Sequence, residues 1–383
     1  MHSYTDLSMK SLKDAEAAFS ANYHEARAAF LEASSATGAQ LQHHACPARG
    51  PSGEALHTDT AWLGDPGAPK VLMVLSGTHG VEGFCGSGFQ VHWLRSGLHR
   101  QLPADTAVLL VHALNPYGFA WLRRVNEDNV DLNRNYLDWR QPPPDNPGYR
   151  DIAAAVLPLR LDGPVAAEAE AVLARYRQQV GEVAFYRALA SGQFIDPQGM
   201  FYGGSGPTWS NQTLHTVMTE QLGRATDVTC IDMHTGLGPY GHGDLISDHE
   251  PGTEAALRVR QFWGDGVSES RRGQTLPLVQ DGPTHFGVTR ALPHARVTFG
   301  TLEFGTYERD LGRAALRADH WLHKHGDPLG AEAAPIKQAL RRQFYPDTLD
   351  WKEAVLFRAH QLVRMALAGM QGASAQRGQP VRD

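Results

Sequence analysis

The pattern of hydrophobic positions alternates between continuous apolar runs and amphipathic segments. Four runs of mainly apolar residues end at polar or glycine-rich turns, which is typical of strands buried on both faces. These runs are residues 70–75, 106–112, 226–231 and 296–302. Residues 7–35 and 84–97 carry apolar side chains at helical spacing. Strands separated by helical segments predict an α/β fold, in which helices cover both faces of a sheet.

Two further stretches are predicted as additions to this sheet. Residues 141–200 open with a proline-rich turn and continue into an alanine-rich helical stretch, and residues 310–372 are mostly helical. No repeat or linker divides the chain, so we expect a single elaborated domain over residues 1–383. Its catalytic core is expected at about residues 41–310, after an N-terminal helix over residues 7–35.

Composition and charge exclude several classes of protein. With 42% hydrophobic and 20% charged residues, the 383-residue chain is not collagen, a coiled coil or a disordered protein. A net charge of −6 gives no overall attraction to nucleic acid or to an anionic membrane, and no apolar run approaches the roughly 20 residues that span a bilayer. The chain starts without a signal-peptide pattern, and its cysteines, Cys46, Cys85 and Cys230, form no C-x-x-C pair. We therefore expect a cytoplasmic protein with no nucleic-acid or membrane partner; whether it forms a homo-oligomer stays open.

Polar residues with metal-binding chemistry lie at the ends of the predicted strands. His79 and Glu82 follow the first strand three residues apart, a spacing that lets an imidazole nitrogen and a carboxylate oxygen meet at one ion. His234 ends the third strand and is a candidate third ligand. Taken singly, these signals are weak, because H-x-x-E occurs by chance and a lone histidine is commonly a hydrogen-bonded core residue. A second histidine pair, His320 and His323, is expected on a solvated helix face.

The segments after the second and fourth strands add groups that suit hydrolysis. Asn133 and Arg134 lie in a loop rich in amides and charges, and they suit an anionic ligand because arginine offers a planar fork that matches a carboxylate. Glu303 is a lone carboxylate inside an apolar strand, where burial is costly and raises the pKa toward that of a general base. Together the candidates predict a His2Glu zinc site with a nearby base, which is typical of a metal hydrolase.

The ordered motifs resemble those of the M14 zinc carboxypeptidases over roughly residues 70–310. The resemblance is strongest to the bacterial DUF2817 branch and more distant to the aspartoacylase and succinylglutamate desuccinylase branch. It rests on H-x-x-E (79–82), N-P-x-G (115–118), V-D-L-N-R-N (130–135), D-x-H-T-G (232–236), T-L-E-F-G (301–305) and the segments 201–204 and 207–210. It implies a zinc carboxypeptidase-like mixed β-sheet flanked by helices, with a helical insertion and a helical C-terminal extension.

The same resemblance implies roles for the metal-binding residues and their neighbours. His79, Glu82 and His234 would bind one Zn²⁺ ion. Glu303 would correspond to the general base and acid, which takes a proton from water and gives it to the leaving amine. Asp131 falls where a carboxylate would orient His79.

Residues that contact the substrate also follow from the resemblance. Arg124 would polarise the scissile carbonyl, and Asn133 and Arg134 would grip the terminal carboxylate of the substrate. Carboxypeptidases of this kind also have a tyrosine between the third ligand and the base that closes over the substrate. The only tyrosine in that interval is Tyr240, directly after the ligand, and we do not expect it to take that role.

We therefore expect a zinc-dependent amide or peptide hydrolase that acts next to a free carboxylate, as a carboxypeptidase does on small peptides. Deacylation of an N-acyl amino acid is the alternative, and a catalytically silent metal- or ligand-binding protein is a second one. Glu303 and Arg124 argue against the silent protein, because binding alone needs no base. The insertion at residues 141–200 is expected to roof the site and to restrict it to small substrates.

Overall fold

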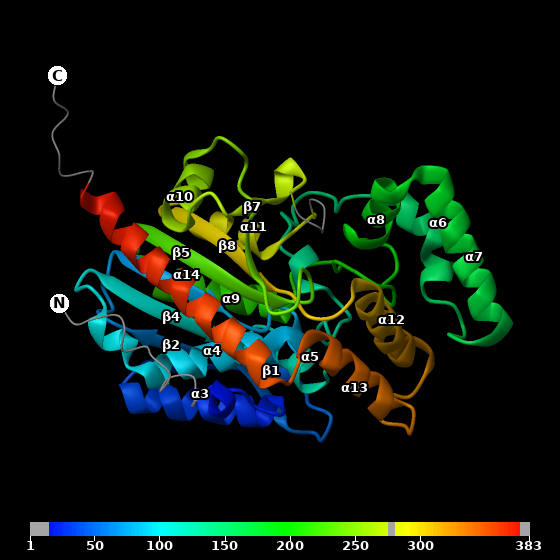
Figure 1. Cartoon of the computed structure of the whole chain (residues 1–383), viewed down its shortest axis with the longest axis horizontal. Helices are drawn as coiled ribbons and strands as arrows, with labels where there is room; N and C mark the ends of the chain where they lie inside the picture. The colour runs from blue at the N-terminus through cyan, green and yellow to red at the C-terminus, as the bar shows by residue number, and fades with distance from the viewer. Residues whose placement is uncertain (1–14, 275–279, 376–383) are drawn as a thin grey trace.

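Within the residues that the structure describes, eight strands form one mixed sheet (Figure 1). This computed structural model describes residues 15–274 and 280–375. Across the sheet the strands run in the order β1-β2-β4-β3-β5-β8-β6-β7, and β4, β3, β5 and β8 are parallel. The strands are β1 (Gln40–Arg49), β2 (Ala55–Leu63), β3 (Lys70–Leu75), β4 (Thr106–His112), β5 (Asp227–Thr235), β6 (Gly243–Ser247), β7 (Ser268–Glu269) and β8 (Arg296–Phe304).

Helices cover both faces of the sheet, as the sequence predicts for an α/β fold. The α-helices of the described residues are α2 (Ala15–Ala18), α3 (Tyr23–Thr37), α4 (Gly83–Ser96), α5 (Pro116–Ala120), α6 (Pro147–Val156), α7 (Gly163–Val180), α8 (Glu182–Ala190), α9 (Trp209–Gln221), α10 (Glu254–Trp263), α11 (Thr284–Ala291), α12 (Arg309–His325), α13 (Ala333–Phe344) and α14 (Leu349–Ala375).

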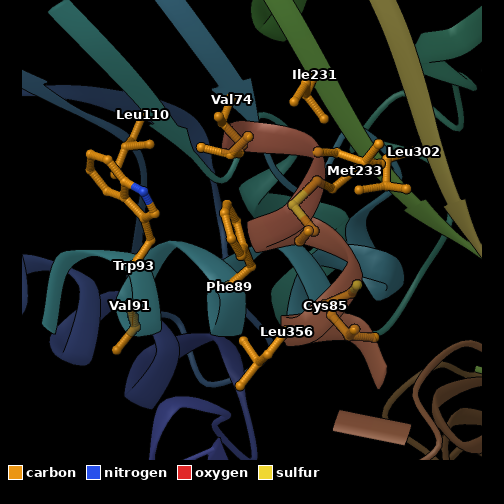
Figure 2. Packing of buried hydrophobic residues seen from close by; sticks show 14 of the residues in the cluster. Val74, Cys85, Phe89, Val91, Trp93, Leu110, Ile231, Met233, Leu302 and Leu356 are labelled. Carbon is orange, nitrogen blue, oxygen red and sulfur yellow. The ribbon is translucent and has the colours of Figure 1, made fainter. Parts of the chain in front are cut away.

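Each face of the sheet has its own hydrophobic core. On one face, α4 and α14 pack against the strands, and Figure 2 shows Phe89 and Leu356 of these helices below Val74, Ile231 and Leu302 of the sheet. On the other face, side chains of α9 and α11 pack against the alternate residues of the same strands. Burial on both faces explains why the central strands read as continuous apolar runs.

The predicted strands are confirmed, whereas the predicted N-terminal helix needs correction. The third and fourth strands continue to Thr235 and Phe304, beyond their apolar runs. In place of one helix over residues 7–35, the structure has α2 and α3, and residues 7–14 lie outside the described part. The interruption follows from Asn22, whose side chain accepts a hydrogen bond from the backbone N–H of Glu25 and so begins a new helix.

The insertion and part of the C-terminal segment lie together at one end of the molecule (Figure 1). Helices α6, α7 and α8 come from the insertion, and they share a hydrophobic cluster with α12 and α13. His320 on α12 is only 2% exposed, so the expected solvated face is wrong for this residue: α12 is covered where α13 packs against it. No helix within the described ranges is long and apolar enough to cross a membrane.

Candidate metal centre

The sheet brings the candidate residues to one edge, where its parallel strands end. His79 and Glu82 lie in the turn that follows β3, and Glu82 ends a short 3₁₀ helix, Gly80–Glu82. His234 on β5 and Glu303 on β8 are register partners in neighbouring parallel strands. Side chains of paired residues project from the same face of a sheet, so this register places Glu303 beside His234. The carboxyl ends of such strands are the usual place for a ligand site in α/β proteins.

The three predicted ligands converge on one point. Candidate ligand atoms of His79, Glu82 and His234 all lie within 4.8 Å of one another, and all three residues are buried. The two Nδ1 atoms are 3.1 Å apart. Glu82 Oε1 is 2.9 Å from His79 Nδ1, and Glu82 Oε2 is 3.1 Å from His234 Nδ1.

Carboxylates behind both imidazoles make this donor set suitable for a divalent ion. Asp131 Oδ1 lies 3.1 Å from His79 Nε2, and Asp232 Oδ2 lies 3.0 Å from His234 Nε2. A carboxylate at Nε2 favours the tautomer whose Nδ1 lone pair is free to bind a metal ion. Burial alone would raise the pKa of Glu82, but its electrostatic interaction with His79 and its hydrogen bond with His234 hold that pKa below its usual value, so Glu82 is ionised. Two imidazoles and a carboxylate match a catalytic zinc site.

Glu303 has the electrostatic character of a proton carrier. It is 8% exposed, and Oε1 accepts a hydrogen bond from the backbone N–H of Leu237 at 3.1 Å. Burial, followed by the negative charge of Glu82, raises the pKa of Glu303 to about 8. A carboxyl group whose pKa lies near neutrality can both accept and return a proton.

Arg124 lies against two carboxylates, those of the predicted ligand Glu82 and of Asp131. Its Nη1 donates to Glu82 Oε1 at 3.1 Å, and its Nε donates to Asp131 Oδ2 at 2.9 Å. The loop that carries Arg124 is held against the turn of His79 and Glu82, because the backbone N–H of Gly80 donates to Arg124 O. A Cβ on Gly80 would lie 2.0 Å from the carbonyl carbon of Gly118, so this close approach requires glycine.

Arg134 is a buried guanidinium held by neutral acceptors. Nη1 donates to the side chain of Gln280 at 2.8 Å, and Nη2 donates to the carbonyl oxygen of Ala190 at 2.6 Å. The ring of Phe201 lies 5.7 Å from this guanidinium. Burial lowers the pKa of Arg134 to about 10, and no carboxylate of the described residues forms an ion pair with it. Asn133 lies beside it and accepts hydrogen bonds from Thr284 through Oδ1.

Seven of the eight predicted site residues, all except Asp131, line one cavity of about 190 Å³. The insertion contributes to its wall through α8, whose residues Tyr186, Leu189 and Ala190 line the cavity. Tyr240 does not line it, and its hydroxyl group instead contacts Thr348 and Asp350. The structure therefore gathers every predicted site residue and leaves Tyr240 outside.

Sequence reasoning missed three groups around this centre. Asp232 was visible in the D-x-H-T-G motif, and its spacing of two residues from His234 on a strand places both side chains on one face. The backbone N–H of Thr235 donates to Glu82 Oε2, which no side-chain pattern indicates. Asp248 also lines the cavity, although nothing in its local sequence marks it.

Comparisons with known proteins add a family match and distant structural likenesses. A family model described as "Protein of unknown function (DUF2817)" matches residues 19–358. No curated protein matches the chain significantly. Carboxypeptidase A from Helicoverpa armigera is 14% identical with a TM-score of 0.44, covering 82% of this chain and 73% of that chain. Succinylglutamate desuccinylase from Chromobacterium violaceum is 15% identical with a TM-score of 0.34, covering 82% and 72%.

Proposed function

The chain belongs to the DUF2817 family, and we propose that it is a zinc-dependent hydrolase that cleaves an amide bond next to a free carboxylate. The observation that carries this proposal is the convergence of both Nδ1 atoms and the Glu82 carboxylate on one point, beside a carboxyl group whose pKa is near 8. A binding site for a metal ion needs the first feature only. Hydrolysis also needs a group that accepts and returns a proton, and the carboxyl group of Glu303 is suited to that task.

The metal would be held by His79, Glu82 and His234. When bound, the ion supplies Lewis acidity at the scissile carbonyl. Glu303 takes the proton of the attacking water and then returns it to the nitrogen of the leaving amine. Because burial keeps its pKa close to neutrality, Glu303 can exchange between its charged and its neutral form at neutral pH, as both transfers require.

We assign a different part of the substrate to each of two arginines, Arg124 and Arg134. Nε and Nη1 of Arg124 already bind carboxylates, so the Nη2 group is the part that we assign to the developing oxyanion. Arg134 has no carboxylate partner within the described residues, so the carboxylate of the substrate would supply its missing counter-charge. Asn133, next to it, adds an amide donor.

Deacylation of an N-acyl amino acid is the second candidate, and the size of the cavity favours it over trimming of long peptides. The cavity of about 190 Å³ is smaller than the roughly 300 Å³ at which drug-sized sites begin. A smaller cavity of about 120 Å³ shares Leu189, Met200 and Arg313 with it.

The proposal is tested by incubating zinc-loaded protein with a mixed pool of short peptides and N-acyl amino acids and measuring the products by mass spectrometry. Cleavage next to a free carboxylate is expected, and C-terminal amide analogues should stay intact. Glu303→Gln should retain zinc by elemental analysis and lose turnover by roughly a thousandfold or more. Equal turnover in this variant would refute the assigned base.

A further inference from the structure

The second cavity, of about 120 Å³, is lined by residues of α6, α7, α8 and α12, at the end of the molecule where the insertion lies (Figure 1). We propose that this cavity binds an apolar acyl chain, so that the substrate is an N-acyl amino acid with a long acyl group. This inference rests on the proposed function and deepens it, because the acyl group is bonded to the carbonyl carbon at which hydrolysis takes place.

The second cavity adjoins the cavity of the candidate metal centre, because three residues line both of them. These residues are Leu189 on α8, Arg313 on α12 and Met200. Leu189 and Met200 are buried, so the two cavities meet at apolar side chains rather than at the outer surface of the protein.

Met200 and Phe201 connect the position of the scissile carbonyl to the second cavity. The ring of Phe201 lines the main cavity and lies 5.9 Å from the guanidinium carbon of Arg124, the residue that we assign to the oxyanion. The acyl group is bonded to that carbonyl and therefore starts beside Phe201. Met200 directly precedes Phe201, and its unbranched, flexible side chain adapts to the group that packs against it.

The walls of the second cavity are mainly apolar. Six of the residues that line it carry apolar side chains: Val156, Leu173, Ala174, Phe185, Leu189 and Met200. Most of them belong to the hydrophobic cluster that the insertion shares with α12 and α13. A ligand that fills this space is therefore surrounded by hydrocarbon, which favours an aliphatic chain over a polar one.

The arginines that line the second cavity already have anionic partners. Each of the three forms an ion pair with a carboxylate: Arg177 with Glu182, Arg313 with Asp310 and Arg317 with Glu170. An anionic ligand would have to compete with these carboxylates, whereas an apolar chain leaves the ion pairs in place. The charges at this cavity therefore do not call for a charged substrate group.

Helix α7 leaves apolar surface available in the second cavity. Of its 18 residues only Ala169 is buried, although the helix packs against α6 and α8. Leu173, which lines the cavity, is only half-buried. A chain bound there would remove this surface from water, and burial of each methylene group raises affinity roughly threefold to fourfold.

The test compares the hydrolysis of N-acetylglycine and N-decanoylglycine, which share the carboxylate-bearing part and differ in the length of the acyl chain. In the zinc-loaded wild-type protein, kcat/KM is expected to be at least tenfold higher for the decanoyl compound. N-acetylnorleucine is the third substrate, because it carries an apolar chain on the amino acid instead of on the acyl group.

Ala174→Trp adds an indole ring at the wall of the second cavity. It should lower kcat/KM for the decanoyl compound at least tenfold and leave the value for the acetyl compound within twofold. Ala167→Trp is the matched control, because Ala167 lies about two turns earlier on α7 and lines neither cavity. Both alanines are exposed, so neither substitution disturbs the core.

Equal kcat/KM for the acetyl and decanoyl compounds, or a wild-type ratio in Ala174→Trp, would overturn the inference. A preference for N-acetylnorleucine without a preference for the decanoyl chain would also overturn it, because the apolar chain would then bind on the amino-acid side.

Binding of both glycine compounds to zinc-loaded Glu303→Gln, measured by calorimetry, separates this inference from the proposed function. Tighter binding of the decanoyl compound that Ala174→Trp abolishes, without hydrolysis by the wild-type protein, would overturn only the proposed function. Hydrolysis without a preference for chain length would overturn only the inference about the acyl chain. Absence of both binding and hydrolysis would overturn both.

Discussion

Asp131 offers a direct test of the metal centre, because it supports a ligand without being one. Its Oδ1 lies 3.1 Å from His79 Nε2, and its Oδ2 accepts from Arg124 at 2.9 Å in a fully buried position. Asp131→Asn keeps the shape but removes the charge that makes His79 a stronger donor at Nδ1. Loss of such a partner commonly weakens metal affinity 10- to 100-fold, or about 1.4–2.7 kcal/mol.

The affinity is measured by competition with a chelating zinc indicator, which needs no substrate. At zinc concentrations above both dissociation constants, the gain in unfolding free energy on adding zinc should be smaller in Asp131→Asn by the same amount. Asp128→Asn is the control, because Asp128 lies on the same loop but is exposed. Wild-type affinity in a folded Asp131→Asn protein would refute the assignment of His79 as an oriented ligand.

Three further substitutions test the assigned base Glu303, the carboxylate-binding residue Arg134 and the close backbone packing at Gly80. Without metal, Glu303 should lower the stability of the wild-type protein relative to Glu303→Gln by up to about 5 kcal/mol as the pH rises from 4.5 to 8, because Glu303 releases its proton at lower pH in the unfolded chain than in the folded one; urea unfolding of both proteins over this range measures the difference. Arg134→Gln should raise KM roughly 100-fold, about 3 kcal/mol, for carboxylate substrates, as initial rates would show. Gly80→Ala should lower stability in calorimetry by roughly 1–3 kcal/mol, because its Cβ meets the backbone of Gly118, whereas Gly206→Ala has open space.

The convergence of the candidate ligands could be predicted because the residues that mark them form short local patterns in the sequence. His79 and Glu82 are close in sequence, and His234 and Glu303 end apolar runs that are recognisable as buried strands. Parallel strands bring their carboxyl ends to one edge, so residues far apart in the chain meet there without any further information. The register that pairs His234 with Glu303 follows from packing of the whole sheet, and the sequence alone does not fix it.

Other parts of the site depend on tertiary contacts that no short pattern encodes. The chemistry of Arg134 predicted that it binds an anion. Its hydrogen-bond partners, Ala190 on α8 and Gln280, are both more than fifty residues away in the sequence, so no local pattern could reveal them. Asp248 directly follows β6, and the pairing of β6 with β8 brings it to the cavity. Strand β6 itself was not predicted. Strand β1 was missed as a long strand because its residues are mostly exposed, which removes the apolar run.

A buried cluster of charges connects the C-terminal helices α12 and α13 to the loop beside the candidate metal site. Arg123 Nε donates to Asp319 Oδ2 on α12 at 2.9 Å, and Lys337 on α13 also donates to Asp319. Burial lowers the pKa of Lys337 to about 8. Because the backbone N–H of Val81 donates to Arg123 O, the cluster fixes both the loop before Arg124 and the turn that carries His79 and Glu82. In the sequence these charges look like a solvated helix face, and only the packing of α12 against α13 makes them part of the scaffold of the site.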